Sequence, residues 1–165
     1  MLRPMKRKLL STFVVLFGLS GCKAATENGT FKIVQGERDG HPLFAMIDSS
    51  RHDNKFKTSF PWFLSISIPL TNPTKDGLTT DSEASALNDW EDSLEKEFAG
   101  ACRFAYVGRV TWNGTRELLY YVDTPDCVVS KLRKFANDHP SRVFNTRCER
   151  DERWEKVSVY LGTGQ

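Results

Sequence analysis

Four cysteines are the residues of this 165-residue chain best suited to covalent chemistry. Cys22 closes an N-terminal apolar segment, whereas Cys102, Cys127 and Cys148 lie in the C-terminal part of the chain. Thiols can be acylated, can pair as disulfides or can bind metals, and the neighbouring residues decide between these reactions. The chemistry of each cysteine therefore follows from the segment that carries it.

The segment before Cys22 has the pattern of a secretory signal peptide. Residues 1–8 contain four positive charges, and residues 9–18 are almost all apolar. That run is half of the roughly 20 residues that a membrane-spanning helix needs. Residues 19–22 (LSGC) resemble the bacterial lipobox, whose cysteine is acylated and becomes the first residue of the mature protein. An ordinary cleaved signal peptide with an incidental cysteine is the alternative.

The lipobox resemblance divides the chain into an anchor and a domain. It implies a signal peptide at 1–21, a lipidated Cys22 with a polar tether at 22–30, a single domain at 31–161 and a flexible tail at 162–165. Lys23 after the cysteine implies the outer membrane, with the domain facing the periplasm. The tether reaches only about 26–29 Å when extended. We therefore expect a lipoprotein that stays close to the membrane of a bacterial cell envelope.

The charge of the mature chain argues against nucleic acid as a partner. Of 23 Lys and Arg residues, four lie in the predicted signal peptide, which leaves 19 against 21 Asp and Glu residues. General nucleic-acid binding needs an excess of basic side chains. Residues 103–107 (RFAYV) match part of an RNA-recognition signature, but the first glycine of that signature is missing.

The periodicity of the mature chain predicts one α+β domain. The expected elements are an N-terminal β-hairpin at 31–37 and 43–48, a strand at 62–70, a helix capped by Thr80, a β-hairpin around residue 113, a helix capped by Thr124, a strand at 142–148 and an extended piece at 157–161. The buried side of the helix after Thr124 is expected to carry Val128, Val129, Leu132, Phe135 and Ala136. From residue 62 onwards this order predicts a ferredoxin-like βαββαβ antiparallel sheet with two helices on one face, preceded by the N-terminal hairpin.

The hairpin around residue 113 has two distinguishable faces. Asn-Gly at 113–114 predicts a type I′ turn, whose register pairs Tyr106 with Tyr121 and Val107 with Tyr120. One face suits packing beneath the helices and carries Ala105, Val107, Leu118, Tyr120 and Val122. The other carries Phe104, Tyr106, Val110, Trp112, Leu119 and Tyr121. This second face is a candidate interaction surface if it is exposed. The alternative is that the N-terminal hairpin or the segment around Trp154 covers it.

The same register brings two cysteines together. It places residue 102 opposite residue 125, so Cys127, near the start of the following helix, lies close to Cys102. We predict a disulfide between them, worth roughly 3–3.5 kcal/mol on the chain-entropy model, with two separately buried thiols as the alternative. Cys148 is then left as a small buried hydrophobic residue.

Six segments together resemble the domain of unknown function 695 family over residues 31–161. They are Gly36–Gly40, the strand that starts at Trp62, Asp76–Leu78 before an acidic helix, Val107–Thr111, Arg116–Tyr121 and Asp151–Trp154. The family has no established catalytic residues, so the resemblance implies a shared fold without assigning an active site.

No spacing in the chain predicts catalysis, a cofactor or a metal site. His41, His52 and His139 lack metal-ligand spacing, and the acidic residues of the helix after Thr80 are expected on a solvated face. We therefore expect a non-catalytic envelope lipoprotein that binds a protein partner or dimerises. The alternative is a periplasmic small-ligand binder or hydrolase-type enzyme. Its pocket would lie between the N-terminal hairpin and the sheet, formed by Asp39, His41, Arg109 and Asp151.

Overall fold

The computed structural model describes residues 29–52 and 54–161. The predicted signal peptide, Cys22, most of the tether and the tail at 162–165 lie outside the described residues. The elements in chain order are β1 (Phe31–Arg38), β2 (His41–Asp48), a 3-10 helix η1 (Ser49–His52), α1 (Asn54–Ser59), β3 (Trp62–Pro69), α2 (Asp81–Phe98), β4 (Phe104–Trp112), β5 (Thr115–Val122), α3 (Pro125–Asp138), β6 (Asn145–Arg150) and α4 (Glu155–Leu161).

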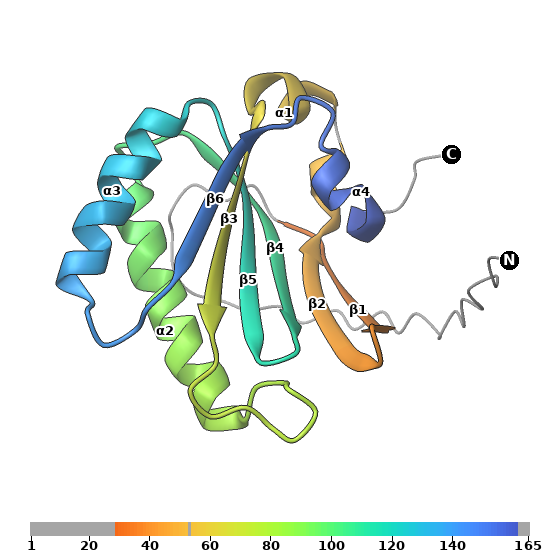
Figure 1. Ribbon diagram of the computed structural model, residues 1–165. Coiled ribbons are helices and arrows are strands. Elements are labelled where there is room, and N and C mark those ends of the chain that lie inside the picture. The colour runs from red at the N-terminus through yellow and green to blue at the C-terminus, as the bar shows by residue number, and fades with distance from the viewer. Residues whose placement is uncertain (1–28, 53, 162–165) are drawn as a thin grey trace, which may run out of the picture.

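The six strands form one antiparallel sheet in the order β1-β2-β4-β5-β3-β6. Helices α2 and α3 pack together over the β5, β3 and β6 side of one face, whereas α4 lies on the opposite face near β2 (Figure 1). The chain is thus a mixed α and β domain, as expected. Its two edge strands, β1 and β6, lie at opposite ends of the sheet.

Local sequence signals position both hairpins and both long helices. The turns at residues 39–40 and 113–114 have positive φ at both central residues, as a type I′ turn requires. Thr80 accepts a hydrogen bond from the backbone N–H of Glu83 and caps α2, and Thr124 occupies the N-cap position of α3. The prediction that Val129 and Ala136 are buried is wrong. The buried residues of α3 are Val128, Leu132 and Phe135, so a narrower part of the helix surface faces the sheet than predicted.

One β-bulge changes the predicted register of the second hairpin. From the turn to Gly108 the pairing is as predicted, but Val107 has no partner, and beyond it Tyr106 pairs with Tyr120 rather than with Tyr121. A Cβ on Gly108, whose φ is +153°, would lie 2.3 Å from the carbonyl oxygen of Met46 on β2. The close approach of two backbones therefore requires glycine at the bulge.

The bulge exchanges the faces of four residues, because side chains alternate along a strand. Phe104 and Tyr106 pack on the helix-covered face with Tyr120, while Ala105 and Val107 belong to the opposite core. The predicted composition of both faces is therefore wrong at residues 104–107. It is correct beyond the bulge, where Val110, Trp112, Leu119 and Tyr121 share one face.

The face opposite α2 and α3 has its own core under the C-terminal segment. Trp154 stacks on Tyr121 with ring centroids 4.0 Å apart, and Val157 and Leu161 of α4 pack beside them. The expectation of an extended piece at 157–161 is wrong. Asp151 accepts the backbone N–H groups of residues 155 and 156 and so starts a helix, whose apolar side chains recur four residues apart.

The predicted disulfide is confirmed. Cys102 and Cys127 are joined, with their Cα atoms 5.6 Å apart, and they link the start of β4 to the first turn of α3. Cys148 is a free thiol on β6, as expected, but it is half-buried rather than buried. Burial and the nearby carboxylate of Glu149 raise its pKa, which disfavours the reactive thiolate.

Candidate binding site

A groove of about 380 Å³ lies between α3 and the segment that leads into β6. Its walls are largely apolar and also include two arginines. The lining residues are Val129, Leu132, Arg133, Ala136, Pro140, Arg142, Val143, Phe144 and Thr146. Val129 and Val143 are 47% and 74% exposed, so the groove opens to solvent along an apolar rim.

A buried ion pair fixes one wall of the groove. Arg142 donates a 2.9 Å hydrogen bond to Glu83 in the first turn of α2, and Glu83 also accepts from the backbone N–H and the hydroxyl of Thr71. Burial opposes ionisation of the Glu83 carboxyl, but the hydrogen bonds from Thr71 and Arg142 outweigh burial and lower its pKa to about 2. The segment at 139–144 is therefore held to α2 by a charged contact rather than by regular secondary structure.

The groove runs beside a free sheet edge. Among the described strands β6 pairs only with β3, and the backbone N–H of Asp151 donates to the carbonyl of Pro61 at 2.8 Å in the continuation of that register. Hydrogen-bonded pairs alternate along an antiparallel ladder, so Thr146, Cys148 and Arg150 direct their backbone N–H and C=O groups away from β3. Those groups are available to another extended chain.

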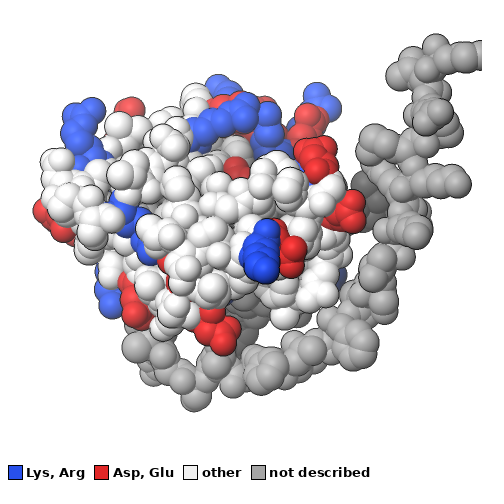
Figure 2. All heavy atoms as spheres, turned by 60° about the horizontal axis from the view of Figure 1, so that its bottom comes forward, with Lys and Arg blue, Asp and Glu red and all other residues white. Residues whose placement is uncertain are grey.

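The charge near the groove is positive on the α3 side. Arg133 is exposed and has no ion pair within the described part of the chain, whereas Lys134 pairs with Glu97 and Asp138. The end of the molecule with the hairpin turns differs, because acidic and basic side chains are scattered there over a largely uncharged surface (Figure 2). The groove thus combines apolar walls, the outward backbone groups of β6 and the guanidinium of Arg133.

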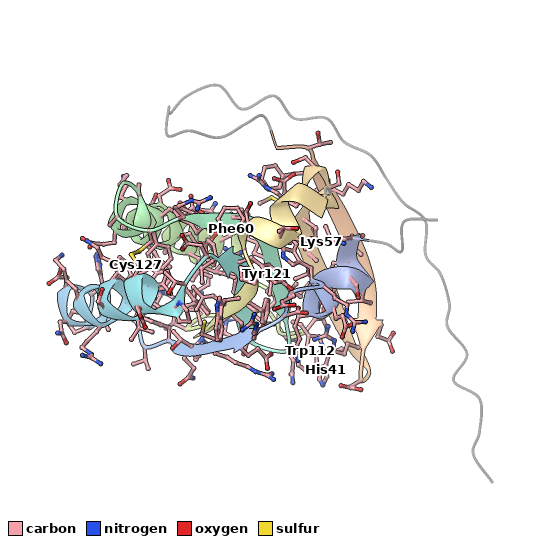
Figure 3. All side chains as sticks on the ribbon, turned by 90° about the horizontal axis from the view of Figure 1, so that it is seen from above. His41, Lys57, Phe60, Trp112, Tyr121 and Cys127 are labelled. Carbon is pink, nitrogen blue, oxygen red and sulfur yellow. A yellow bond between two sulfur atoms is a disulfide. The ribbon has the colours of Figure 1, made fainter. Side chains whose placement is uncertain are left out.

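The residues of the alternative enzyme pocket do not come together. Asp39 and His41 lie at the turn between β1 and β2, and His41 is on the opposite side of the molecule from Cys127 (Figure 3). Arg109 donates to Glu91 at 2.8 Å on the helix-covered face. Asp151 lies on the other face, where it accepts the hydroxyl of Tyr121 at 2.5 Å. These four side chains therefore lie in three separate parts of the fold and do not line one pocket.

The six residues of the predicted interaction face are also divided between faces. Val110, Leu119 and Tyr121 are buried with Trp112 packed beside them, and Trp154 and α4 lie over this core. Phe104 and Tyr106 are half-buried against the core beneath α2 and α3. No single exposed surface is formed by this set within the described residues.

A buried charge cluster lies between α2 and the sheet. Glu91 accepts hydrogen bonds from Arg116 at 2.9 Å and from Arg109 at 2.8 Å, and Asn88 accepts from Arg109 at 2.7 Å. Burial lowers the pKa of the Arg116 guanidinium, and Glu91 counters that effect. Burial also raises the pKa of the adjacent Tyr106 hydroxyl. These partners satisfy one another, so the cluster holds α2 to β4 and β5.

The sequence reasoning missed the groove. Its lining comes from a helix and from an irregular segment before β6, which no periodic pattern joins. Val129 and Val143 are exposed apolar residues of this lining, but single exposed valines are too common on protein surfaces to indicate a site.

Neither a metal centre nor a membrane-spanning helix is found in the parts that the structure describes. Within residues 29–52 and 54–161, no three His, Cys, Asp or Glu side chains gather as metal ligands would. No helix of those residues has the length and apolar character needed to cross a bilayer. Cys22, the predicted lipidation site, lies outside the described residues.

Comparison with known proteins identifies the family of the chain. A model described as a family of unknown function (DUF695) matches residues 31–161, which is the domain from β1 to α4. No curated protein and no solved structure matches the chain. The chain belongs to the family of unknown function DUF695.

Proposed function

We propose that this protein is a lipid-anchored, non-catalytic binding module of the bacterial envelope, and that it holds an extended segment of a partner protein in the groove between α3 and β6. The observation that carries the proposal is the free edge of β6 beside an apolar groove of about 380 Å³. An extended peptide can add a strand to such an edge, gaining affinity from main-chain hydrogen bonds and specificity from side-chain pockets.

The partner segment has a defined chemistry under this proposal. Its backbone pairs with the outward groups of Thr146 and Cys148, and every second side chain points into the groove. Those side chains are apolar, since Val129, Phe144 and other apolar residues line the walls. A carboxylate on the segment pairs with Arg133, whose guanidinium has no partner among the described contacts.

The fold proposed for this module is ferredoxin-like, extended by the N-terminal hairpin. In its support, β3 to β6 follow the order strand, helix, strand, strand, helix, strand, and their order in the sheet is β4-β5-β3-β6. This order, with α2 and α3 on one face, supports the proposal of a split βαβ arrangement. The hairpin β1–β2 adds two strands beside β4 and leaves the opposite edge, β6, uncovered by another strand.

The anchor is proposed from residues 19–22, with the lipid on Cys22 and the outer membrane as the location. Mass spectrometry of the mature N-terminal peptide and membrane fractionation test this part of the proposal. We expect wild type to carry acyl chains and to sediment with membranes, and Cys22→Ser to lose both properties. Retention of membrane association by Cys22→Ser without acylation would refute the anchor.

The groove is tested by blocking the outward backbone of β6. Heptapeptides are selected from a random displayed library on the full-length protein and then titrated by fluorescence anisotropy. Thr146→Pro removes an outward N–H without removing a β3–β6 hydrogen bond, and Thr146→Ala is the matched control that keeps the N–H. We expect affinity to fall at least tenfold in Thr146→Pro and to change less than twofold in Thr146→Ala.

The selected sequences provide a second, independent readout. Strand addition predicts apolar residues at alternate positions and an acidic residue, and Arg133→Glu should weaken binding of the acidic peptides while sparing versions with glutamine in its place. Equal binding to wild type and Thr146→Pro, with unchanged circular dichroism, would refute strand addition. Failure to select any peptide above background would also refute strand addition.

A further inference from the structure

We infer that one face of the β1–β2 hairpin rests on the lipid bilayer that holds the acylated Cys22, an inference that depends on the proposed anchor. The face in question, the hairpin face, carries the apolar side chains of Phe31, Ile33, Phe44 and Met46, with Gln35 and Glu37 toward the turn and the buried Asp48 opposite Phe31. Phe31 and Ile33 are 45% and 37% exposed, and Ile33 pairs with Met46 across the hairpin. Phe44 and Met46 are half-buried, and neither hydrophobic core includes them.

The hairpin face is left open by the arrangement of the helices. Alternate residues of β2, namely Leu43, Ala45 and Ile47, point to the core beneath α4, so the residues between them point to the opposite face. Helices α2 and α3 cover that opposite face over β4, β5, β3 and β6, and the core beneath them includes no described residue of β1 or β2 (Figure 1). An apolar surface of this kind is expected to contact another apolar phase.

The position of the anchor favours lipid as that phase. The described chain begins at Gly29, where the backbone carbonyl of Thr30 accepts the N–H of Ser49 at 2.7 Å and fixes the start of β1. Seven residue steps separate Gly29 from Cys22, a reach of at most about 23–25 Å. Phe31 and Ile33 follow immediately, so the most exposed apolar side chains of the hairpin lie at the end nearest the anchor.

The distribution of apolar and polar residues along β1 agrees with an orientation in which the start of the strand lies nearest the membrane. On the hairpin face its residues run Phe31, Ile33, Gln35 and Glu37, from apolar near the anchor to polar near the turn. The apolar end can enter the headgroup region while Glu37 remains in water. Because β1 and β6 are opposite edges of the sheet, this orientation leaves the groove beside β6 facing away from the membrane.

Photolabelling of the intact lipoprotein tests the contact. The acylated full-length protein is reconstituted in phosphatidylcholine vesicles that contain a small fraction of diazirine-bearing phosphatidylcholine, irradiated, digested and mapped by mass spectrometry. We expect labelled peptides from 31–35 and 42–48 and little label in 155–161, where Val159 is 76% exposed on α4. Label that spreads evenly over these peptides, or is confined to the N-terminal acylated residues, would overturn the inference.

Two matched serine variants sharpen the result. Ile33→Ser is expected to lower label in the 42–48 peptide at least threefold, whereas Val159→Ser should leave it unchanged. Protein–protein cross-links between β1 segments in place of lipid label would show that a second copy covers the face and would also overturn the inference. The mass of the N-terminal peptide reports acylation of Cys22 separately, so failure of the anchor is distinguished from failure of the membrane contact.

Discussion

Replacement of Glu83 by glutamine should remove a pH-dependent contribution to stability near the groove. The pKa of Glu83 is about 2 in the folded protein, against 4.5 for an unperturbed carboxyl. Each pKa unit corresponds to about 1.4 kcal/mol, so the ionised carboxylate stabilises the fold by about 3 kcal/mol at neutral pH. Glutamine keeps an acceptor for Thr71 but leaves the charge of Arg142 without its carboxylate. We therefore expect Glu83→Gln to lose about 2–3 kcal/mol at pH 7.

The sign of the pH effect follows from the direction of the shift. Because the folded-state pKa lies below the unfolded value, the stabilisation is complete above about pH 4.5 and is lost as the pH falls toward 2. Wild type should therefore lose stability through this window, whereas Glu83→Gln should show a smaller slope. The two proteins should converge in stability near pH 2.

Urea unfolding followed by circular dichroism, repeated between pH 2.5 and 7, measures both quantities. Asp89→Asn, on the exposed side of the same helix, is the control and should change little. A loss below about 0.5 kcal/mol for Glu83→Gln at pH 7 would refute the reasoning, because surface substitutions reach that size. The same conclusion would follow from equal pH slopes in wild type and variant.

Three further changes test other parts of the fold by the same unfolding assay. Replacing both Cys102 and Cys127 by alanine removes a disulfide with a sequence separation of 25. The chain-entropy relation predicts that the free energy of unfolding falls by about 3.5 kcal/mol, and a fall of less than about 1 kcal/mol would contradict that prediction. Gly108→Ala places a Cβ 2.3 Å from a backbone oxygen and should cost at least about 2 kcal/mol, so a neutral outcome would exclude the bulge geometry. Asp151→Asn weakens the bond from Tyr121 and the cap of α4, for which we expect a loss of about 1–2 kcal/mol; unchanged stability would argue against that role.

The elements predicted correctly depend on contacts between near neighbours. The two-residue turns at 39–40 and 113–114 require positive φ, which Asp-Gly and Asn-Gly supply, and Thr80 caps α2 through a backbone N–H three residues away. The hairpin turn also brought the two disulfide cysteines close enough for their pairing to be predicted. Such interactions span a few residues, so the sequence determines them before any tertiary structure forms.

The errors arose where distant segments decide the local structure. The bulge at Val107 exists because Gly108 lies against the backbone of β2, more than sixty positions earlier in the chain. It reversed the faces of residues 104–107 of β4 but not those of β5, and so divided the predicted interaction face. The segment at 155–161 became a helix because Asp151 caps it and Trp154 packs on Tyr121 of β5.

By itself the sequence determined the order of the strands and of helices α2 and α3, the two tight turns, the disulfide and the family of the domain, but not the short helices η1 and α1. Tertiary structure alone decided the groove, since α3 and the segment before β6 become its walls only when Arg142 binds Glu83 across 59 residues of chain. It also decided which apolar residues stay open to solvent. Those features depend on long-range packing, which the local pattern of a single sequence does not encode.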